Sequence, residues 1–277
     1  SSDEFYKDLW YMNKPDNMSF LEHLEELRWH ILRSIFVIII VGIVCFIMKD
    51  FIFDTIIFGP KKMSFPTYEF LCESARFIGF ETNFCGTEFP FIIQNRTMGG
   101  QFSAHIWTSI LGGFIISFPY VIYELWKFIS PGLHTNEKMK SGGTIFICSL
   151  LFFLGVLFGY YVVTPLSINF FGSYQVSNEV LNEIDISSYI ALVRSSSLAC
   201  GIMFELPIII FFLSRIGVVT PSSLIKYRKY ALLIVLTFAA IITPPDVASQ
   251  FIVAIPVMIL YQISIFISRL VLKKQNR

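Results

Sequence analysis

Long apolar runs constrain this 277-residue chain more than any other feature of its sequence. A helix needs about 20 mostly apolar residues to cross the roughly 30 Å hydrocarbon core of a bilayer. Only 15% of the residues are charged, against about a quarter in an ordinary globular domain. The sequence therefore predicts an all-α membrane protein with six transmembrane helices. The expected spans cover about 31–49, 104–127, 144–163, 189–213, 229–243 and 250–268.

The fifth and sixth expected spans are short. At about 1.5 Å per residue the fifth reaches roughly 20–23 Å, so it must thin the bilayer, tuck against its neighbours or recruit a partner. Lys and Arg collect before the first span, after the second, after the fourth and after the sixth. Because cytoplasmic loops carry the excess of Lys and Arg, both termini are predicted to be cytoplasmic.

The chain is expected to form one domain, because it has no internal repeat and no low-complexity segment. Residues 1–18 are predicted to be a cytoplasmic N-terminal extension and 271–277 a cytoplasmic tail. Between them, 19–270 is predicted to form the six-span domain, with a long external loop at about 50–103. The first apolar run lacks a small-residue cleavage site, so it is not expected to be a removable signal peptide.

The expected external loop contains a helical pattern and two cysteines. Apolar residues at helical spacing in "PTYEFLCESARFIGF" predict a short amphipathic helix. It lies either on the outer membrane surface or on the protein's own external cap. Cys72 and Cys85 are a possible disulfide if that side is oxidising, and two unpaired thiols are the alternative.

The segment "SFLEHLEELRWHIL" at 19–32 places three glutamates directly before the first span. Its opening fits a capping box, which gives one of the acids a structural role. Glu25 can pair with Arg28, and Glu26 with His30, but exposed pairs contribute only tenths of a kcal/mol. Because anionic lipids line the cytoplasmic surface, acids at this place indicate a cationic guest.

Other acids allow two interpretations each. Glu205 lies inside the fourth span, where an ionisable residue is costly and usually faces a cavity or a polar partner. Pro207 is expected to distort the same helix. These two residues leave open an alternative function, a proton-coupled secondary transporter that uses Glu205. Asp246 in "ITPPDVASQ" is either a helix cap or a functional acid, and Glu137 alone reads as an ordinary loop acid.

Motifs for the common catalytic sites do not occur in the sequence. It contains no H-E-x-x-H, no G-x-S-x-G and no Walker A motif. The net charge of +1 gives no indication of nucleic-acid binding. The chain is therefore not expected to be an enzyme, to hold a metal or cofactor, or to bind nucleic acid.

Several motifs occur in order along about 18–270: "FLEHLEELRWHIL", "FPYVIYELWKFISPGLHTNEK", "FGYYVVTPLSINF", "FELPIIIFFLSRIGVVTPSSL" and "ITPPDVASQFIVAIPVMILY". They resemble the TatC family of the twin-arginine translocase. The resemblance implies a cupped six-span bundle in the bacterial inner membrane that receives signal peptides with paired arginines. It also implies TatB-like and TatA-like single-span partners, self-association, contact with lipid, and export of folded proteins driven by the proton gradient.

The resemblance also implies roles for particular residues. The signal-binding acids of the family match Glu26 and Glu137, and the planar fork of an arginine suits a carboxylate better than a lysine does. Two such pairs at a partly desolvated interface supply several kcal/mol. The other matches are Leu27, Arg28, Phe128 and Pro131 in the signal-binding patch, Glu205 and Gln250 as intramembrane polar residues facing a partner, Pro244, Pro245 and Asp246 as an external motif, and Pro60 and Pro119 as structural prolines.

Overall fold

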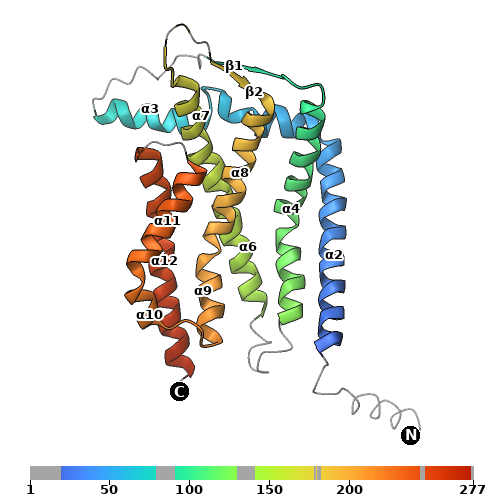
Figure 1. Ribbon diagram of the computed structural model, residues 1–277, viewed down its shortest axis with the longest axis vertical. Coiled ribbons are helices and arrows are strands. Elements are labelled where there is room, and N and C mark those ends of the chain that lie inside the picture. The colour runs from blue at the N-terminus through green and yellow to red at the C-terminus, as the bar shows by residue number, and fades with distance from the viewer. Residues whose placement is uncertain are drawn as a thin grey trace, which may run out of the picture.

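Long helices running side by side form the body of the protein, and short elements cap one end (Figure 1). Helix α2 (Phe20–Ile47) begins and helix α12 (Val247–Gln275) ends at the same end of the bundle, which we call the proximal end. The opposite, distal end carries α3 (Pro66–Ile78) and the strands β1 (Phe91–Gln94) and β2 (Asn182–Asp185). The computed structural model describes residues 20–78, 91–129, 141–177, 179, 182–243 and 247–275.

The helices pack mainly as neighbours in pairs. Helix α2 packs on α4, α6 on α8, α9 on α12, and α11 on α12. Figure 1 shows α2 at one edge of the bundle and the α11–α12 pair at the other. The remaining elements are η1 (Phe51–Ile57), η2 (Gly59–Lys61), α4 (Gly100–Ile129), α6 (Ser141–Phe158), η4 (Gly159–Val163), α7 (Thr164–Ser173), α8 (Ile186–Phe204), α9 (Leu206–Arg215), α10 (Pro221–Lys226) and α11 (Arg228–Ile242).

The number of membrane-length helices differs from the number of expected spans. The expected fifth span corresponds to α11, whose 15 residues reach about 22 Å and fall short of a bilayer core of about 30 Å. The chain is thus a multi-pass membrane protein, and the count of six spans stays a prediction. Among the described residues, five stretches are long and apolar enough to cross: Leu24–Ile47, Gly100–Ile129, Gly143–Ser173, Ile186–Arg215 and Gln250–Lys273.

Two of the expected spans have other boundaries than the sequence predicts. The acidic segment and the first apolar run form one helix of 28 residues, which begins at Phe20, as the capping box predicts. Its membrane-length part begins at Leu24 rather than near residue 31. Its polar start continues the helix because nothing in it breaks one. The third expected span, 144–163, continues through η4 and α7 to Ser173. The acids of the opening motif are therefore fixed to a rigid membrane helix.

Two short strands are an addition to the expected all-α fold. Strand β1 pairs in parallel with β2, in a register that places Phe91 opposite Asn182. Each strand has four residues, too few for an alternating pattern to stand out in the sequence. Arg96 Nη2 lies 3.3 Å from Glu183 Oε2 and adds an exposed ion pair. The pairing ties the segment before α4 to the segment before α8.

Glycines bring two helix pairs into close contact. A Cβ atom on Gly113 of α4 would lie 2.6 Å from the Ile38 carbonyl oxygen and 2.8 Å from the Gly42 nitrogen, both on α2. A Cβ atom on Gly155 of α6 would lie 2.5 Å from the Cys200 carbonyl oxygen on α8. Lipid supplies no hydrophobic force between helices, so close backbone packing of this kind contributes to holding them together.

Helix α3 is the amphipathic helix expected in the external loop. Tyr68 is 2% exposed, and its hydroxyl lies 3.0 Å from the Pro60 carbonyl oxygen and 3.1 Å from that of Pro165. Burial raises the pKa of Tyr68 above its ordinary value. The first turn of α3 therefore packs on the protein's own external cap, which is one of the two positions expected for this helix. Cys72 is disulfide-bonded, while Cys85 lies outside the described residues, so their pairing stays a prediction.

Candidate functional site

A buried carboxylate joins α2 and α4 near the proximal end. Glu124 on α4 is 3% exposed and accepts a hydrogen bond of 2.5 Å from Nδ1 of His30 on α2. Arg33 Nη1 lies 4.0 Å from the same oxygen, and the Tyr120 side chain lies near this carboxyl group. A carboxylate is stable in such a place where donors surround it. We call this contact the α2–α4 seam.

Two residues predicted for signal binding lie next to the seam. Glu26 is one helical turn before His30 on α2, and Phe128 is one turn after Glu124 on α4. The rings of His30 and Phe128 make an edge contact, with centroids 6.3 Å apart. The structure thus brings the acidic opening motif and the end of α4 to one place.

The side chain of Glu26 has a carboxylate oxygen without a hydrogen-bond donor among the described residues. This oxygen, Oε2, is shielded from solvent. The expected pairs Glu25–Arg28 and Glu26–His30 are wrong, because neither occurs among the ion pairs of the described residues and His30 bonds to Glu124 instead. Leaving a buried acceptor unpaired costs free energy. Because Glu26 Oε2 is already desolvated, a donor of a bound ligand could pair with it without a further desolvation cost for this oxygen.

The start of α2 also carries exposed apolar side chains, mostly on other faces of the helix than Glu26. Leu24, Trp29 and Ile31 are 45%, 55% and 48% exposed, which is a large apolar surface at the start of a membrane helix. Leu27 is half-buried and Arg28 is exposed. The proximal end of α2 therefore offers a carboxylate for a cationic group and apolar surface for a chain that continues into the membrane.

Sequence reasoning missed the seam itself. Glu124 received no role, and His30 was expected to pair with Glu26. A signal was present, because an acid in the last turns of an apolar span needs a polar partner. The neighbouring helix that supplies it cannot be read from the local sequence.

Glu205 lies where the fourth expected span breaks. Pro207 lacks an amide hydrogen, so α8 ends at Phe204 and α9 begins at Leu206. The carboxyl group of Glu205 lies beside the Cys148 thiol on α6, but its Oε1 is buried without a hydrogen-bond partner among the described residues. This acid keeps an unsatisfied acceptor inside the bundle.

The remaining predicted site residues are placed as follows. Gln250 Nε2 donates to the Leu236 carbonyl oxygen at 3.1 Å and joins α12 to α11. Pro60 is buried in η2, and α4 continues through Pro119. Within the described ranges, no three His, Cys, Asp or Glu residues are grouped to hold a metal. Besides Cys85, five predicted site residues lie outside the described residues: Pro131, Glu137, Pro244, Pro245 and Asp246.

Comparison with known proteins identifies the family. A family model described as "Sec-independent protein translocase protein (TatC)" matches residues 22–256, which is most of the chain. The chain belongs to the TatC family. The TatC of Blattabacterium sp. subsp. Periplaneta americana is 44% identical over 264 residues and covers 95% of this chain and 99% of that protein. The TatC of Aquifex aeolicus is 34% identical and covers 94% and 98%.

A solved TatC structure agrees with this assignment. The crystal structure described as the twin-arginine translocase receptor TatC matches with a TM-score of 0.68 and 32% identity, over 90% of this chain and 99% of that one. TatC proteins are components of a protein translocase. The chain is therefore a translocase component and not an enzyme, and the alternative of a secondary transporter for small solutes has no support from these relatives.

Proposed function

We propose that this chain is the signal-peptide receptor and core subunit of a twin-arginine translocase in the bacterial cytoplasmic membrane. In this role it exports folded proteins with the energy of the proton-motive force. Family membership supports the translocase, and the similar crystal structure is described as a receptor. The observation that carries the receptor role is the shielded, unpartnered oxygen of Glu26 beside the α2–α4 seam.

Recognition of the paired arginines follows from the chemistry of their side chains. A guanidinium group presents its donors in a rigid planar fork that matches both oxygens of a carboxylate, whereas an ammonium group is a point charge. Glu26 takes one arginine and Glu137 takes the other. The apolar part of the signal peptide then lies along the exposed apolar residues of α2, Leu24, Trp29 and Ile31.

The seam has a positioning role in this proposal. His30 and Glu124 fix the first turns of α2 against the last turns of α4 through a buried charged hydrogen bond. This contact keeps the distance and orientation between Glu26 and Phe128 constant while a peptide binds. Since Glu124 already has a donor, an arginine of the signal peptide meets Glu26 first.

Orientation and partners complete the proposal. The proximal end faces the cytoplasm, because Lys and Arg gather in the segments on that side. Helix α11 is too short to match the bilayer, so the α11–α12 edge is where TatA-like and TatB-like helices dock. Glu205 offers its unsatisfied oxygen to a polar group of such a partner.

A peptide-binding experiment tests the receptor role. A fluorescent signal peptide with paired arginines is titrated against the detergent-purified protein, and its Arg-Arg→Lys-Lys form serves as the second ligand. We expect Glu26→Gln to weaken binding of the arginine peptide by about tenfold, or about 1.4 kcal/mol, and to reduce its preference over the lysine peptide. Glu25→Gln, the neighbouring exposed acid, is the matched control and should keep both. Unchanged affinity in Glu26→Gln contradicts the proposal.

A further inference from the structure

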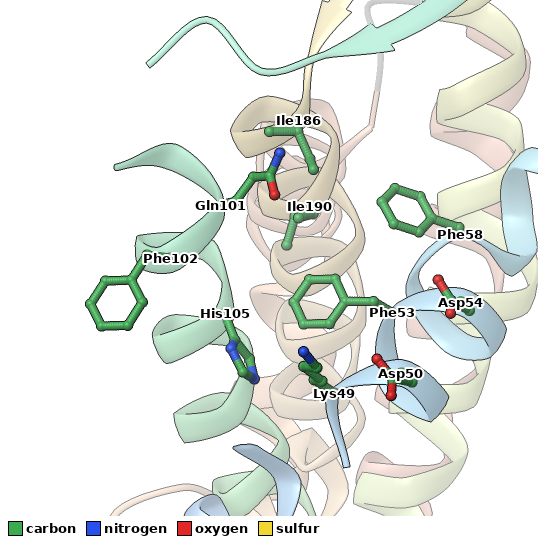
Figure 2. Close-up of a pocket in the computed structure, with 10 residues that line it drawn as sticks. All are labelled: Lys49, Asp50, Phe53, Asp54, Phe58, Gln101, Phe102, His105, Ile186 and Ile190. Carbon is green, nitrogen blue, oxygen red and sulfur yellow. The ribbon is translucent and has the colours of Figure 1, made fainter. Parts of the chain in front are cut away.

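A pocket of about 380 Å³ opens at the distal end of the bundle, far from the proposed signal-peptide site (Figure 2). Its volume falls within the range of small-molecule sites, about 300–1,000 Å³. Figure 2 shows Lys49, Asp50 and Asp54 projecting from the segment that continues α2 into η1. Gln101 and His105 of α4 line the other side. The lining therefore combines one cation, two carboxylates and an amide.

The charges of this pocket are available to a ligand. None of the ion pairs between described residues involves Lys49, Asp50 or Asp54. The two aspartates lie about one helical turn apart, so they repel each other unless a cation lies between them. His105 is already committed, because its Nε2 donates to the Phe46 carbonyl oxygen at 3.0 Å and its ring stacks on Phe46 at 3.9 Å.

The pocket lies where three membrane-length helices reach the bilayer surface. The first stretch ends at Ile47, and two others begin at Gly100 and Ile186, all next to residues of the pocket lining. Phe51 and Phe102 at this level are 54% and 65% exposed, as lipid-facing residues are. A ligand in the pocket therefore has its polar part at the interface and its apolar part among lipid chains.

We infer that this pocket binds the headgroup of a zwitterionic phospholipid with a primary ammonium group, phosphatidylethanolamine. Lys49 donates to the phosphate oxygens, and the ammonium group of the lipid donates hydrogen bonds to Asp50 and Asp54. The aromatic rings of Phe53 and Phe58 form the apolar wall beneath the headgroup. A choline lipid has no N–H to donate, and an anionic glycerol lipid brings no cation to the aspartates.

The test compares lipids on the whole detergent-purified protein. Native mass spectrometry measures binding of phosphatidylethanolamine, phosphatidylcholine and phosphatidylglycerol with identical acyl chains, and we expect the first to bind at least about fivefold more tightly. Equal binding of the three lipids, or tightest binding of phosphatidylglycerol, overturns the inference. Free phosphoethanolamine should bind at least about tenfold more weakly than the lipid, and equal binding would overturn the assignment to a lipid.

Variants of exposed residues connect this preference to the pocket. Asp50→Asn/Asp54→Asn should abolish the preference for phosphatidylethanolamine over phosphatidylcholine, and Lys49→Gln should weaken binding of all three lipids. Glu73→Gln changes an exposed acid of α3 at the same end, outside the pocket lining, and should leave the preference intact. Persistence of the preference in the double aspartate variant overturns the inference. Since this site lies apart from Glu26, peptide binding by these variants is a separate readout and should stay unchanged.

Discussion

Glu124 and Glu205 both lie inside membrane-length helices, but their surroundings differ. Glu124 receives a hydrogen bond from His30 at 2.5 Å, and a guanidinium group of Arg33 lies 4.0 Å away. Glu205 lies at a helix break beside the thiol of Cys148, and its Oε1 has no hydrogen-bond partner among the described residues. The first carboxyl group is satisfied by the fold, and the second is satisfied only in part.

This difference separates a positioning role from a binding role. A buried acid with donors from the neighbouring helix holds two helices in one arrangement, and removing one partner leaves an uncompensated charge. An acid with an unsatisfied oxygen costs stability, so its presence is better explained by a partner that arrives from outside. Under the proposed function, the seam at Glu124 would position the signal-peptide site, and Glu205 would take part in assembly with partner subunits.

Removal of the histidine of the seam should have the largest effect. His30→Leu leaves Glu124 buried without its main donor, and we expect the free energy of unfolding to fall by about 3 kcal/mol. Denaturation in detergent measures this loss. The double variant His30→Leu/Glu124→Leu removes the charge as well and should recover most of the stability. A double variant as unstable as the single one would show that the pair is not a charged contact.

Widening the seam should cost somewhat less. Gly113→Ala places a methyl group 2.6 Å from the Ile38 carbonyl oxygen, so α2 and α4 must move apart. We expect a loss of about 2 kcal/mol and weaker binding of the signal peptide, measured by denaturation and by peptide titration. The control is Gly143→Ala, because a Cβ atom there meets nothing within 4 Å. Equal losses in the two variants would contradict a close seam.

The same substitution at both glutamates should have different effects on stability. Glu205→Leu removes an unsatisfied acceptor and should change the free energy of unfolding by less than about 1 kcal/mol, whereas Glu124→Leu should destabilise by about 2 kcal/mol. Glu205→Leu should also reduce co-purification of TatA-like and TatB-like subunits while peptide binding stays normal. Normal assembly and export in this variant would remove the proposed role of Glu205.

The smallest effect concerns the other end of α8. Asp185 caps this helix by accepting a hydrogen bond of 2.8 Å from the Ser187 amide, and this bond and one from the Arg96 amide hold the pKa of its carboxyl group below the ordinary value. A carboxyl group whose pKa is lower in the folded state stabilises the fold at pH values above its unfolded-state pKa of about 3.9. This contribution is lost as the pH falls through the folded-state pKa.

Thermal unfolding between about pH 6 and about pH 3 measures this contribution. The melting temperature of the wild-type protein should fall more over this range than that of Asp185→Asn, which cannot change its charge. Glu183→Gln, an exposed acid of the same strand, is the matched control. Identical pH dependence of the wild type and Asp185→Asn would show that this cap does not titrate with folding.

The sequence predicts what depends on hydrophobic length and local pattern. It places the long helices, the amphipathic helix at Pro66–Ile78 and the break near Pro207 correctly, because each has a local physical cause. The β1–β2 pair joins segments about 90 residues apart along the chain, and its four-residue strands have no local signal. The membrane-length part of α2 begins at Leu24, earlier than the expected residue 31, because the amphipathic segment and the apolar run share one helix.

In the candidate site, too, the sequence predicted residues with a local motif but not the contacts between distant segments. Glu26 and Phe128 were predicted through the family motif, and their closeness to one seam comes from the packing of α2 on α4. The His30–Glu124 bond joins residues 94 positions apart, so local spacing pointed to the wrong partner for His30. Glu137, the second predicted acid, lies outside the described residues and keeps its role as a prediction.

The most direct test of the receptor site is photocrosslinking of a signal peptide with a reactive probe beside its paired arginines. We predict crosslinks to the first turns of α2 and to the end of α4 around Phe128. They should be lost in Glu26→Ala/Glu137→Ala and kept in the Glu25→Gln control. Crosslinks that persist unchanged in the double variant would show that the arginines are held elsewhere, and the account of Glu26 as the receptor acid would be wrong.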